Sequence, residues 1–139
     1  MSLILRRILT VVILLTVSFK VFAPSNNAIV IFTSQPYEPF RKLISAIGMV
    51  ETKFDTLAYN PEEEAVGYFQ IRPIRVQDYN ERTGNSYQPV DMYDYKTSEK
   101  VFLYYASEIG PYNFEKIAKS WNGSGKKTLQ YWKNVKKYL

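Results

Sequence analysis

The chain has no cysteine and no histidine among its 139 residues. Without cysteine it has no disulfide framework, no thiol nucleophile and no lipidated cysteine behind a signal sequence. Without histidine it lacks Ser-His-Asp catalysis, Cys-His catalysis and the usual ligands of a zinc site. Catalysis would therefore depend on carboxylate, tyrosine, lysine or serine side chains, and we expect neither a metal ion nor another cofactor.

The first 23 residues have the composition of a targeting segment. Two arginines precede an apolar run at residues 8–17, which is the order of a signal peptide. Lys20 interrupts this run before it reaches the roughly 20 residues that a spanning helix needs. We expect residues 1–23 to be a signal peptide or a retained membrane anchor and residues 24–36 to be a linker. The protein is expected to be exported to the periplasm or cell envelope.

Charge is unevenly distributed along the chain. Residues 24–115 contain 8 Lys and Arg against 13 Asp and Glu, a net charge of −5, whereas residues 116–139 contain seven lysines and no acid, a net charge of +7. Such a segment can bind nucleic acid, anionic lipid or an acidic polymer, or it can be the solvated face of a helix. No nucleic-acid-binding motif accompanies the charge, so we expect no nucleic-acid partner.

One apolar helix face leads to a single carboxylate. Residues 39–47 predict an amphipathic helix. Its apolar residues are spaced i, i+3, i+4 and i+7: Phe40, Leu43, Ile44 and Ile47. The next position on this face is Glu51, where apolar neighbours would remove hydration and raise the pKa of the carboxyl, as a general acid at neutral pH requires. Glu51 is therefore a candidate general acid; the alternative is a fraying helix end that points to solvent.

The rest of the chain predicts short helices with at most a small sheet. Residues 54–64 are loop-like, and residues 65–71 predict a turn or small hairpin. Further helices are expected at 73–79, from an N-cap at Thr97 to 109, from an N-cap at Asn113 to Trp121, and from Thr128 to 139. The apolar side of the last helix would comprise Leu129, Trp132, Val135 and Leu139. The predicted fold class is α+β and predominantly α-helical.

Four short motifs follow one another along the chain. Glu51 at a helix end is followed by Gly67-Tyr68-Phe69-Gln70, then by Trp121-Asn122-Gly123, and then by Tyr131. Their order and spacing resemble the soluble-type lytic transglycosylases of glycoside hydrolase family 23, the lysozyme-like group that includes goose-type lysozyme. The resemblance covers residues 40–139. It implies a lysozyme-like fold with at most a small β-hairpin, in a catalytic domain at residues 37–139.

The resemblance implies roles for the first two motifs. Glu51 takes the catalytic position, and Thr52 stands where the family usually has Ser. The segment at residues 67–70 matches the family's Gly-Leu-Met-Gln, so Tyr68, Phe69 and Gln70 are candidate substrate-binding residues. Gln70 would hydrogen-bond sugar or acetamide groups, and Phe69 would supply an apolar wall. Considered without the family, Gln70 could equally be a turn residue.

The resemblance also implies roles near the C-terminus. Trp121 and Asn122 match the family's Tyr-Asn-x-Gly, and the larger ring of Trp121 would stack on a pyranose face. Tyr131 matches the late tyrosine that lies near the catalytic Glu in relatives. Two structural alternatives remain open. Trp121, spaced i+4 from Ile117, could be a core residue, and Asn122-Gly123 could be a helix C-cap.

The resemblance implies cleavage of peptidoglycan, first of all by a lytic transglycosylase. In that reaction the substrate's N-acetyl group stabilises the anomeric centre, and one Glu acts as acid and then as base to give a 1,6-anhydro product. A goose-type hydrolase would use water instead. A second carboxylate for hydrolysis could be Asp55, one of Glu62–Glu64, Asp78, Asp91 or Asp94, and spacing singles out none.

The alternative outside the enzymes is a non-catalytic carbohydrate-binding or envelope protein with the same fold. The expected partner in either case is the glycan strand of peptidoglycan. Membrane contact would come through the N-terminal segment. The protein is expected to act as a monomer.

Overall fold

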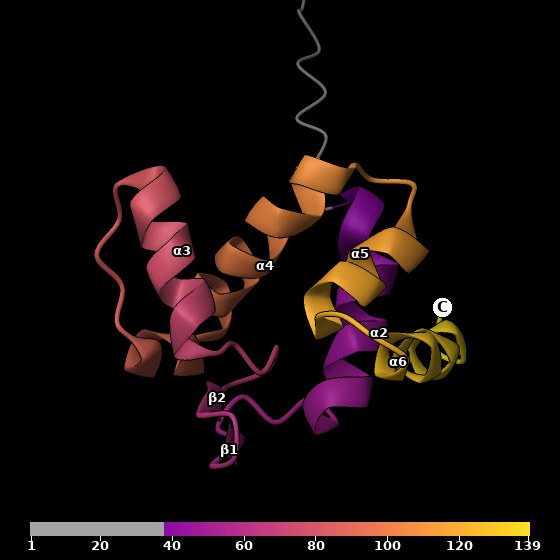
Figure 1. Ribbon diagram of the computed structural model, residues 1–139, viewed down its shortest axis with the longest axis horizontal. Helices are drawn as coiled ribbons and strands as arrows, with labels where there is room; N and C mark the ends of the chain where they lie inside the picture. Colours follow the sequence, from indigo (N-terminus) through magenta and orange to yellow (C-terminus); the bar gives the residue numbers. More distant parts are fainter. Residues whose placement is uncertain (1–37) are drawn as a thin grey trace, which may run out of the picture. The chain divides into compact units, whose positions relative to one another are not determined.

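The computed structural model describes residues 38–139, so the segments expected at 1–23 and 24–36 lie outside the described residues. The described part is mostly helical, with one two-stranded antiparallel sheet (Figure 1). Its elements are η1 (Glu38–Phe40), α2 (Arg41–Thr52), β1 (Tyr59–Asn60), β2 (Ala65–Val66), α3 (Pro73–Thr83), η2 (Pro89–Tyr93), α4 (Tyr95–Ile109), α5 (Phe114–Asn122) and α6 (Lys127–Lys136). The predicted α+β, predominantly α-helical class is confirmed. None of the helices among these residues is long and apolar enough to cross a membrane.

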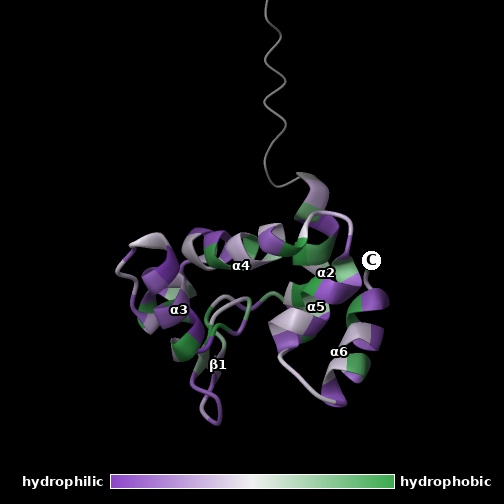
Figure 2. Cartoon of the chain, turned by 45° about the horizontal axis from the view of Figure 1, so that its top comes forward, coloured by the Kyte–Doolittle hydropathy of each residue, from purple (hydrophilic) through white to green (hydrophobic). Residues whose placement is uncertain are grey.

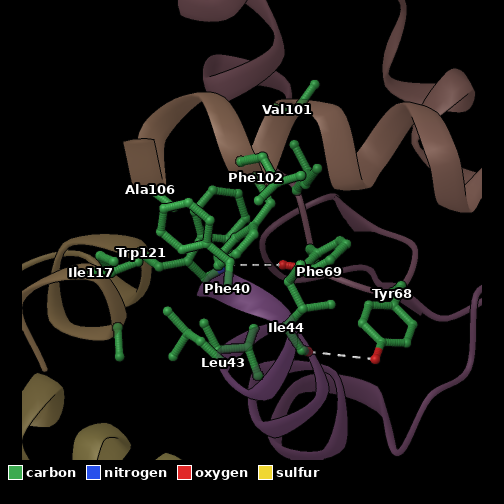
Figure 3. Packing of buried hydrophobic residues seen from close by; sticks show 14 of the residues in the cluster. Phe40, Leu43, Ile44, Tyr68, Phe69, Val101, Phe102, Ala106, Ile117 and Trp121 are labelled. Atoms are coloured by element: carbon green, nitrogen blue, oxygen red, sulfur yellow. Dashed lines mark hydrogen bonds between the residues drawn. The ribbon is translucent and has the colours of Figure 1, made fainter. Parts of the chain in front are cut away.

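Helix α2 contributes one apolar face to the hydrophobic core. Its buried residues are Leu43, Ile44, Ala46, Ile47 and Gly48. Phe40, just before the helix, is buried with them. This is the face that the i, i+3, i+4, i+7 spacing predicts, so that prediction is confirmed. Figure 3 shows Leu43, Ile44 and Phe40 in the same cluster as side chains from α4 and α5.

Three aromatic side chains join the turn after β2 to α4 and α5. Phe69 stacks on Phe102 of α4 with ring centroids 4.8 Å apart and an interplanar angle of 9°. Trp121 of α5 meets Phe102 edge to face at 4.9 Å, and its indole nitrogen donates a hydrogen bond of 3.1 Å to the Phe69 carbonyl (Figure 3). Buried aromatic pairs of this geometry stabilise a core beyond their buried area.

Tyr68 packs directly on the middle of α2. A Cβ atom at Gly48 would lie 2.0 Å from Cζ of the Tyr68 ring, so only glycine fits there. The Tyr68 hydroxyl donates to the Ile44 carbonyl at 3.5 Å. Thr52 Oγ1 lies 3.3 Å from both the Gly48 and Tyr68 carbonyls. The turn is thereby held against the last two turns of α2, beside Glu51.

The sheet is small, as predicted. Strand β1 pairs with β2 in antiparallel register, Tyr59 opposite Val66. Val66 then forms a second antiparallel bridge with Ile71, which closes the hairpin expected within residues 65–71. The backbone turns at Gly67 with φ 73°, and a Cβ there would lie 2.1 Å from the Met92 carbonyl oxygen. A side chain is therefore excluded at Gly67 by conformation and by space.

The predicted boundaries of α3 and α4 differ from the structure, and α6 ends at Lys136 and not at residue 139. Helix α3 continues past Tyr79 to Thr83 and ends at Gly84, whose φ of 71° allows a left-handed C-cap. The N-cap of α4 is Asp94 and not Thr97. Asp94 Oδ2 accepts from both the backbone nitrogen and the hydroxyl of Thr97 at 2.8 Å, so Thr97 occupies the third position of the helix. The predicted Asn113 N-cap of α5 is confirmed, because its Oδ1 accepts from the Lys116 nitrogen.

The predicted apolar side of α6 is only partly correct, because Val135 is buried and Trp132 packs against the core, whereas Leu129 and Leu139 are exposed. The buried residues of α6 are Thr128, Tyr131 and Val135, whereas Leu129 is 55% exposed. Helix α6 packs against both α2 and α5 (Figure 1). Tyr131 lies on the buried side with Thr128 and Val135, and its hydroxyl reaches Glu51 at the end of α2. Leu129, two positions before Tyr131, consequently faces solvent.

Candidate active site

Glu51 lies on the last turn of α2, where the buried face of the helix ends. It follows Ile47 by four positions and Gly48 by three, so it continues the row of buried side chains. The residue itself is only partly buried. Its carboxyl therefore combines apolar surroundings with an opening to the surface, and the expectation of a solvated, fraying helix end is not met.

Tyr131 holds the Glu51 carboxyl from the opposite helix. Its hydroxyl donates a hydrogen bond of 2.6 Å to Glu51 Oε1. Loss of solvent raises the pKa of Glu51 to about 7, although the hydrogen bond from Tyr131 opposes that shift. Burial and the neighbouring carboxyl raise the pKa of Tyr131 as well, so its hydroxyl stays protonated and remains a donor. A carboxyl with this pKa exists in both the acid and the carboxylate form at neutral pH.

Three charged side chains act on Glu51 from nearby elements. The negative charge of Glu63 raises the pKa of Glu51, whereas Arg72 and Arg75 lower it. Glu63 lies in the turn between β1 and β2, and its Oε2 is 3.1 Å from Nε of Arg72. Both members of this ion pair are about half exposed, so the pair is screened by solvent. The pair therefore contributes little to stability, whereas both of its charges shift the pKa of Glu51.

A surface cavity of about 590 Å³ opens beside Tyr131. Its lining residues are Glu63, Arg72, Asn122, Gly123, Ser124, Lys127, Gln130, Tyr131 and Asn134. Sequence reasoning missed Arg72, Lys127, Gln130 and Asn134. The α6 residues could have been found from helical spacing, because positions 127, 130 and 134 share one side of the helix, next to the side that carries Tyr131. No comparable signal marks Arg72, which precedes Pro73 at the start of α3.

The turn at residues 67–70 supports the site without lining it. Phe69 has no exposed surface, so its side chain cannot form an apolar wall for a substrate. Tyr68 is buried on α2 by the contact with Gly48 and likewise does not line a groove. These two expectations are corrected for the same reason: the rings fill the space between the turn, α2 and α4.

Gln70 is a turn residue in this structure. Its backbone has φ 50°, in the left-handed region. Its side-chain nitrogen donates to the Gly67 carbonyl at 3.1 Å and to the Ala58 carbonyl at 3.4 Å. The side chain is partly buried. The side-chain amide therefore links the turn at residues 67–70 to Ala58, just before β1. This agrees with the alternative that Gln70 is a turn residue.

Trp121 does not offer a free ring face to a sugar. It is 6% exposed, and its edge packs on the aromatic core. The Arg75 guanidinium lies over the indole at 4.3 Å from the ring centroid, and it donates to the Trp121 carbonyl at 3.2 Å. The expectation of a pyranose-stacking platform is thus corrected to the core alternative. Asn122 is the last residue of α5 and lines the cavity, and Gly123 is the C-cap.

Most of the other candidate carboxylates have structural partners. Asp55 accepts from the Leu57 nitrogen at 2.8 Å, and Asp91 accepts from the Gln88 nitrogen at 2.7 Å. Asp78 accepts from the Tyr105 hydroxyl and from Arg82, and Asp94 caps α4. Among the second carboxylates considered from sequence, Glu63 is the one whose charge raises the pKa of Glu51.

Within residues 38–139, no group of three His, Cys, Asp or Glu side chains is placed to hold a metal ion. The cavity presents the Tyr131 hydroxyl, which is bonded to Glu51, together with the Glu63 carboxylate, amides and two cations. This set can donate a proton to a bound oxygen, take a proton back, and hydrogen-bond a polar polymer. Comparison of the chain with protein-family models, with curated proteins and with solved structures finds no match.

Proposed function

We propose that this protein is an exported, peptidoglycan-cleaving lytic transglycosylase with a lysozyme-like arrangement of its helices and hairpin. The observation that carries the proposal is the Glu51 carboxyl. Its pKa is raised to about 7, and it accepts a hydrogen bond of 2.6 Å from Tyr131, which lines a polar cavity. The order of motifs that resembles glycoside hydrolase family 23 supports the same conclusion.

In the first step Glu51 gives its proton to the glycosidic oxygen between N-acetylmuramic acid and N-acetylglucosamine. The bond from this oxygen to the anomeric carbon breaks, and the substrate's own N-acetyl group stabilises the positive charge that develops. Glu51 is then a carboxylate. Tyr131 continues to donate to it, and the charge of Arg75 stabilises the same form.

In the second step the Glu51 carboxylate takes the proton of the C6 hydroxyl on the muramic acid. The hydroxyl oxygen attacks the anomeric carbon, which gives a 1,6-anhydro ring and returns Glu51 to its acid form. One carboxyl serves both steps because its pKa lies near neutrality. The C6 hydroxyl belongs to the reacting sugar, so it has the advantage of proximity over a water molecule.

A second candidate function is hydrolysis of the same bond, as in goose-type lysozyme. Glu63 favours it, because this carboxylate lines the cavity and acts electrostatically on Glu51. A carboxylate at that position could accept the proton of an attacking water. In that mechanism the product carries a reducing end in place of the 1,6-anhydro ring.

The test is digestion of purified peptidoglycan followed by mass analysis of the muropeptides. We expect products lighter by one water than reducing-end products, and loss of at least about a hundredfold in rate for Glu51→Gln. Glu81→Gln, an exposed change on α3, is the matched control and should retain full activity. Reducing-end products that disappear in Glu63→Gln would favour the hydrolase. Absence of any cleavage, with binding to peptidoglycan retained, would favour a non-catalytic protein.

A further inference from the structure

Helix α6 has three sides, and one of them serves neither the core nor the cavity. The buried side comprises Thr128, Tyr131 and Val135. The cavity side comprises Lys127, Gln130 and Asn134. The third side, called the outer face below, comprises Lys126, Leu129, Lys133 and Lys136. These four positions are spaced i, i+3, i+7 and i+10, so they lie along one side of the helix.

The outer face is fully in solvent. Leu129 is 55% exposed, and all three lysines are exposed. The segment from residue 116 onward contains no acidic side chain. Among the described residues no carboxylate pairs with these three lysines. Their positive charge is therefore uncompensated by the protein itself.

Apolar groups lie among and beside these lysines. Trp132 borders the outer face and is partly buried. Tyr138 and Leu139, which follow α6, are exposed. Figure 2 shows hydrophilic and hydrophobic residues alternating along α6. Trp132 packs against the core and leaves part of its surface beside Leu129, so the outer face offers apolar contact among its lysines and suits a partner that takes both.

We propose that the outer face of α6 is a docking surface for the anionic headgroups of a membrane. Lysine side chains near an anionic leaflet are attracted to it, and leucine and tryptophan side chains enter the boundary between headgroups and acyl chains. A carboxylate-bearing wall polymer would satisfy the lysines but would gain little from Leu129. The chemistry of the face thus favours anionic lipid over an anionic glycan.

An N-terminal segment retained as an anchor would provide a second contribution of the same kind. Arg6 and Arg7 precede the apolar run from Ile8 to Val17. Stable membrane association of a peripheral protein takes two signals, because one alone is readily reversible. The outer face supplies a second signal, of electrostatic and interfacial character. The cavity residues of α6 lie on a different side, so docking leaves them open.

The test uses the full chain and sedimentation with vesicles. One set of vesicles is neutral phosphatidylcholine, and the other contains phosphatidylglycerol as a third of its lipid. Lys133→Gln/Lys136→Gln removes two charges from the outer face. The matched control, Lys42→Gln/Lys96→Gln, removes two charges from exposed positions on α2 and α4. Circular dichroism and urea unfolding verify that both pairs remain folded.

We expect the outer-face pair to weaken binding to anionic vesicles by about tenfold or more at low salt. The control pair should weaken it by less than about threefold, and neither pair should change binding to neutral vesicles. Leu129→Ser should weaken anionic-vesicle binding also at high salt, where the lysines are screened. Equal losses in the two pairs would overturn the proposal in favour of net charge alone. Loss of binding to purified peptidoglycan, with vesicle binding intact, would overturn it in favour of a wall polymer.

Discussion

Replacing Glu51 with glutamine should stabilise the folded protein at about pH 8 and leave its stability nearly unchanged at about pH 4. In the unfolded chain a glutamate loses its proton near pH 4.3, whereas burial raises the pKa of Glu51 to about 7 in the folded protein. Between these values the folded state keeps a proton that the unfolded state has released. The free energy of unfolding of the parent therefore falls as pH rises through this interval and is constant above it.

The size of the effect follows from the same shift. A difference of about 2.7 pKa units, at about 1.4 kcal/mol per unit, corresponds to about 4 kcal/mol. This is an upper value, because Glu51 is partly exposed and solvent screens its charge. Glutamine keeps the shape and still accepts the Tyr131 hydroxyl, but it carries no charge to desolvate.

The assay is urea unfolding of the parent and of Glu51→Gln across this pH range, with circular dichroism as the measure of unfolding. The absence of histidine and cysteine simplifies it, because no such side chain titrates in the same interval. Asp78 and Asp94 have lowered pKa values and titrate at more acidic pH. Glu81→Gln should show no such pH dependence relative to the parent. A pH-independent difference for Glu51→Gln would show a hydrated carboxyl and remove the basis for a general acid.

Three other changes test the surroundings of the site. Tyr131→Phe removes a hydrogen bond that lowers the pKa of Glu51, so the alkaline limb of the kcat/KM profile should move to higher pH. At the same time kcat should fall about tenfold or more. A move of the limb to lower pH would contradict the assignment. Glu63→Gln removes a charge that raises the same pKa, so the limb should move to lower pH, and an unchanged pH profile would count against the contact. Gly48→Ala should cost about 2 kcal/mol of stability in thermal or urea unfolding, because its Cβ would lie 2.0 Å from a tyrosine ring. Ser45→Ala, on the exposed side of α2, is its control and should be neutral or slightly stabilising; equal stability of the two variants would contradict the packing.

Periodicity predicted the parts of the site that depend on one helix. The apolar face of α2 led directly to Glu51, because each buried position is fixed by local spacing. Periodicity failed for Leu129 on α6. This residue is exposed although it is more hydrophobic than Tyr131, which is buried. The buried side of that helix is the side that packs on α2 and α5, and packing between distant segments has no signature in a local pattern.

For the motif residues, the sequence indicated which residues lie near the site but not which way their side chains face. The sequence correctly indicated that Tyr131 would lie near Glu51. It could not say that Trp121 is covered by Arg75 on α3, or that Phe69 stacks on Phe102 of α4. Which side of a ring is free depends on neighbours from other elements. The catalytic role of Glu51 and the substrate-binding roles of Asn122 and Tyr131 stay predictions.

The bond between Tyr131 and Glu51 joins residues that are 80 positions apart in the chain. Contacts of such long separation form late in folding, because closing a long loop costs entropy before the contact rewards it. Helix α2 can form early, but the Glu51 carboxyl gains its Tyr131 partner only when α6 docks. The raised pKa is therefore a property that appears only with the completed tertiary structure. In a partly unfolded chain Glu51 would be present, but its pKa would not be raised. Recovery of the proposed activity during refolding should therefore follow the docking of α6.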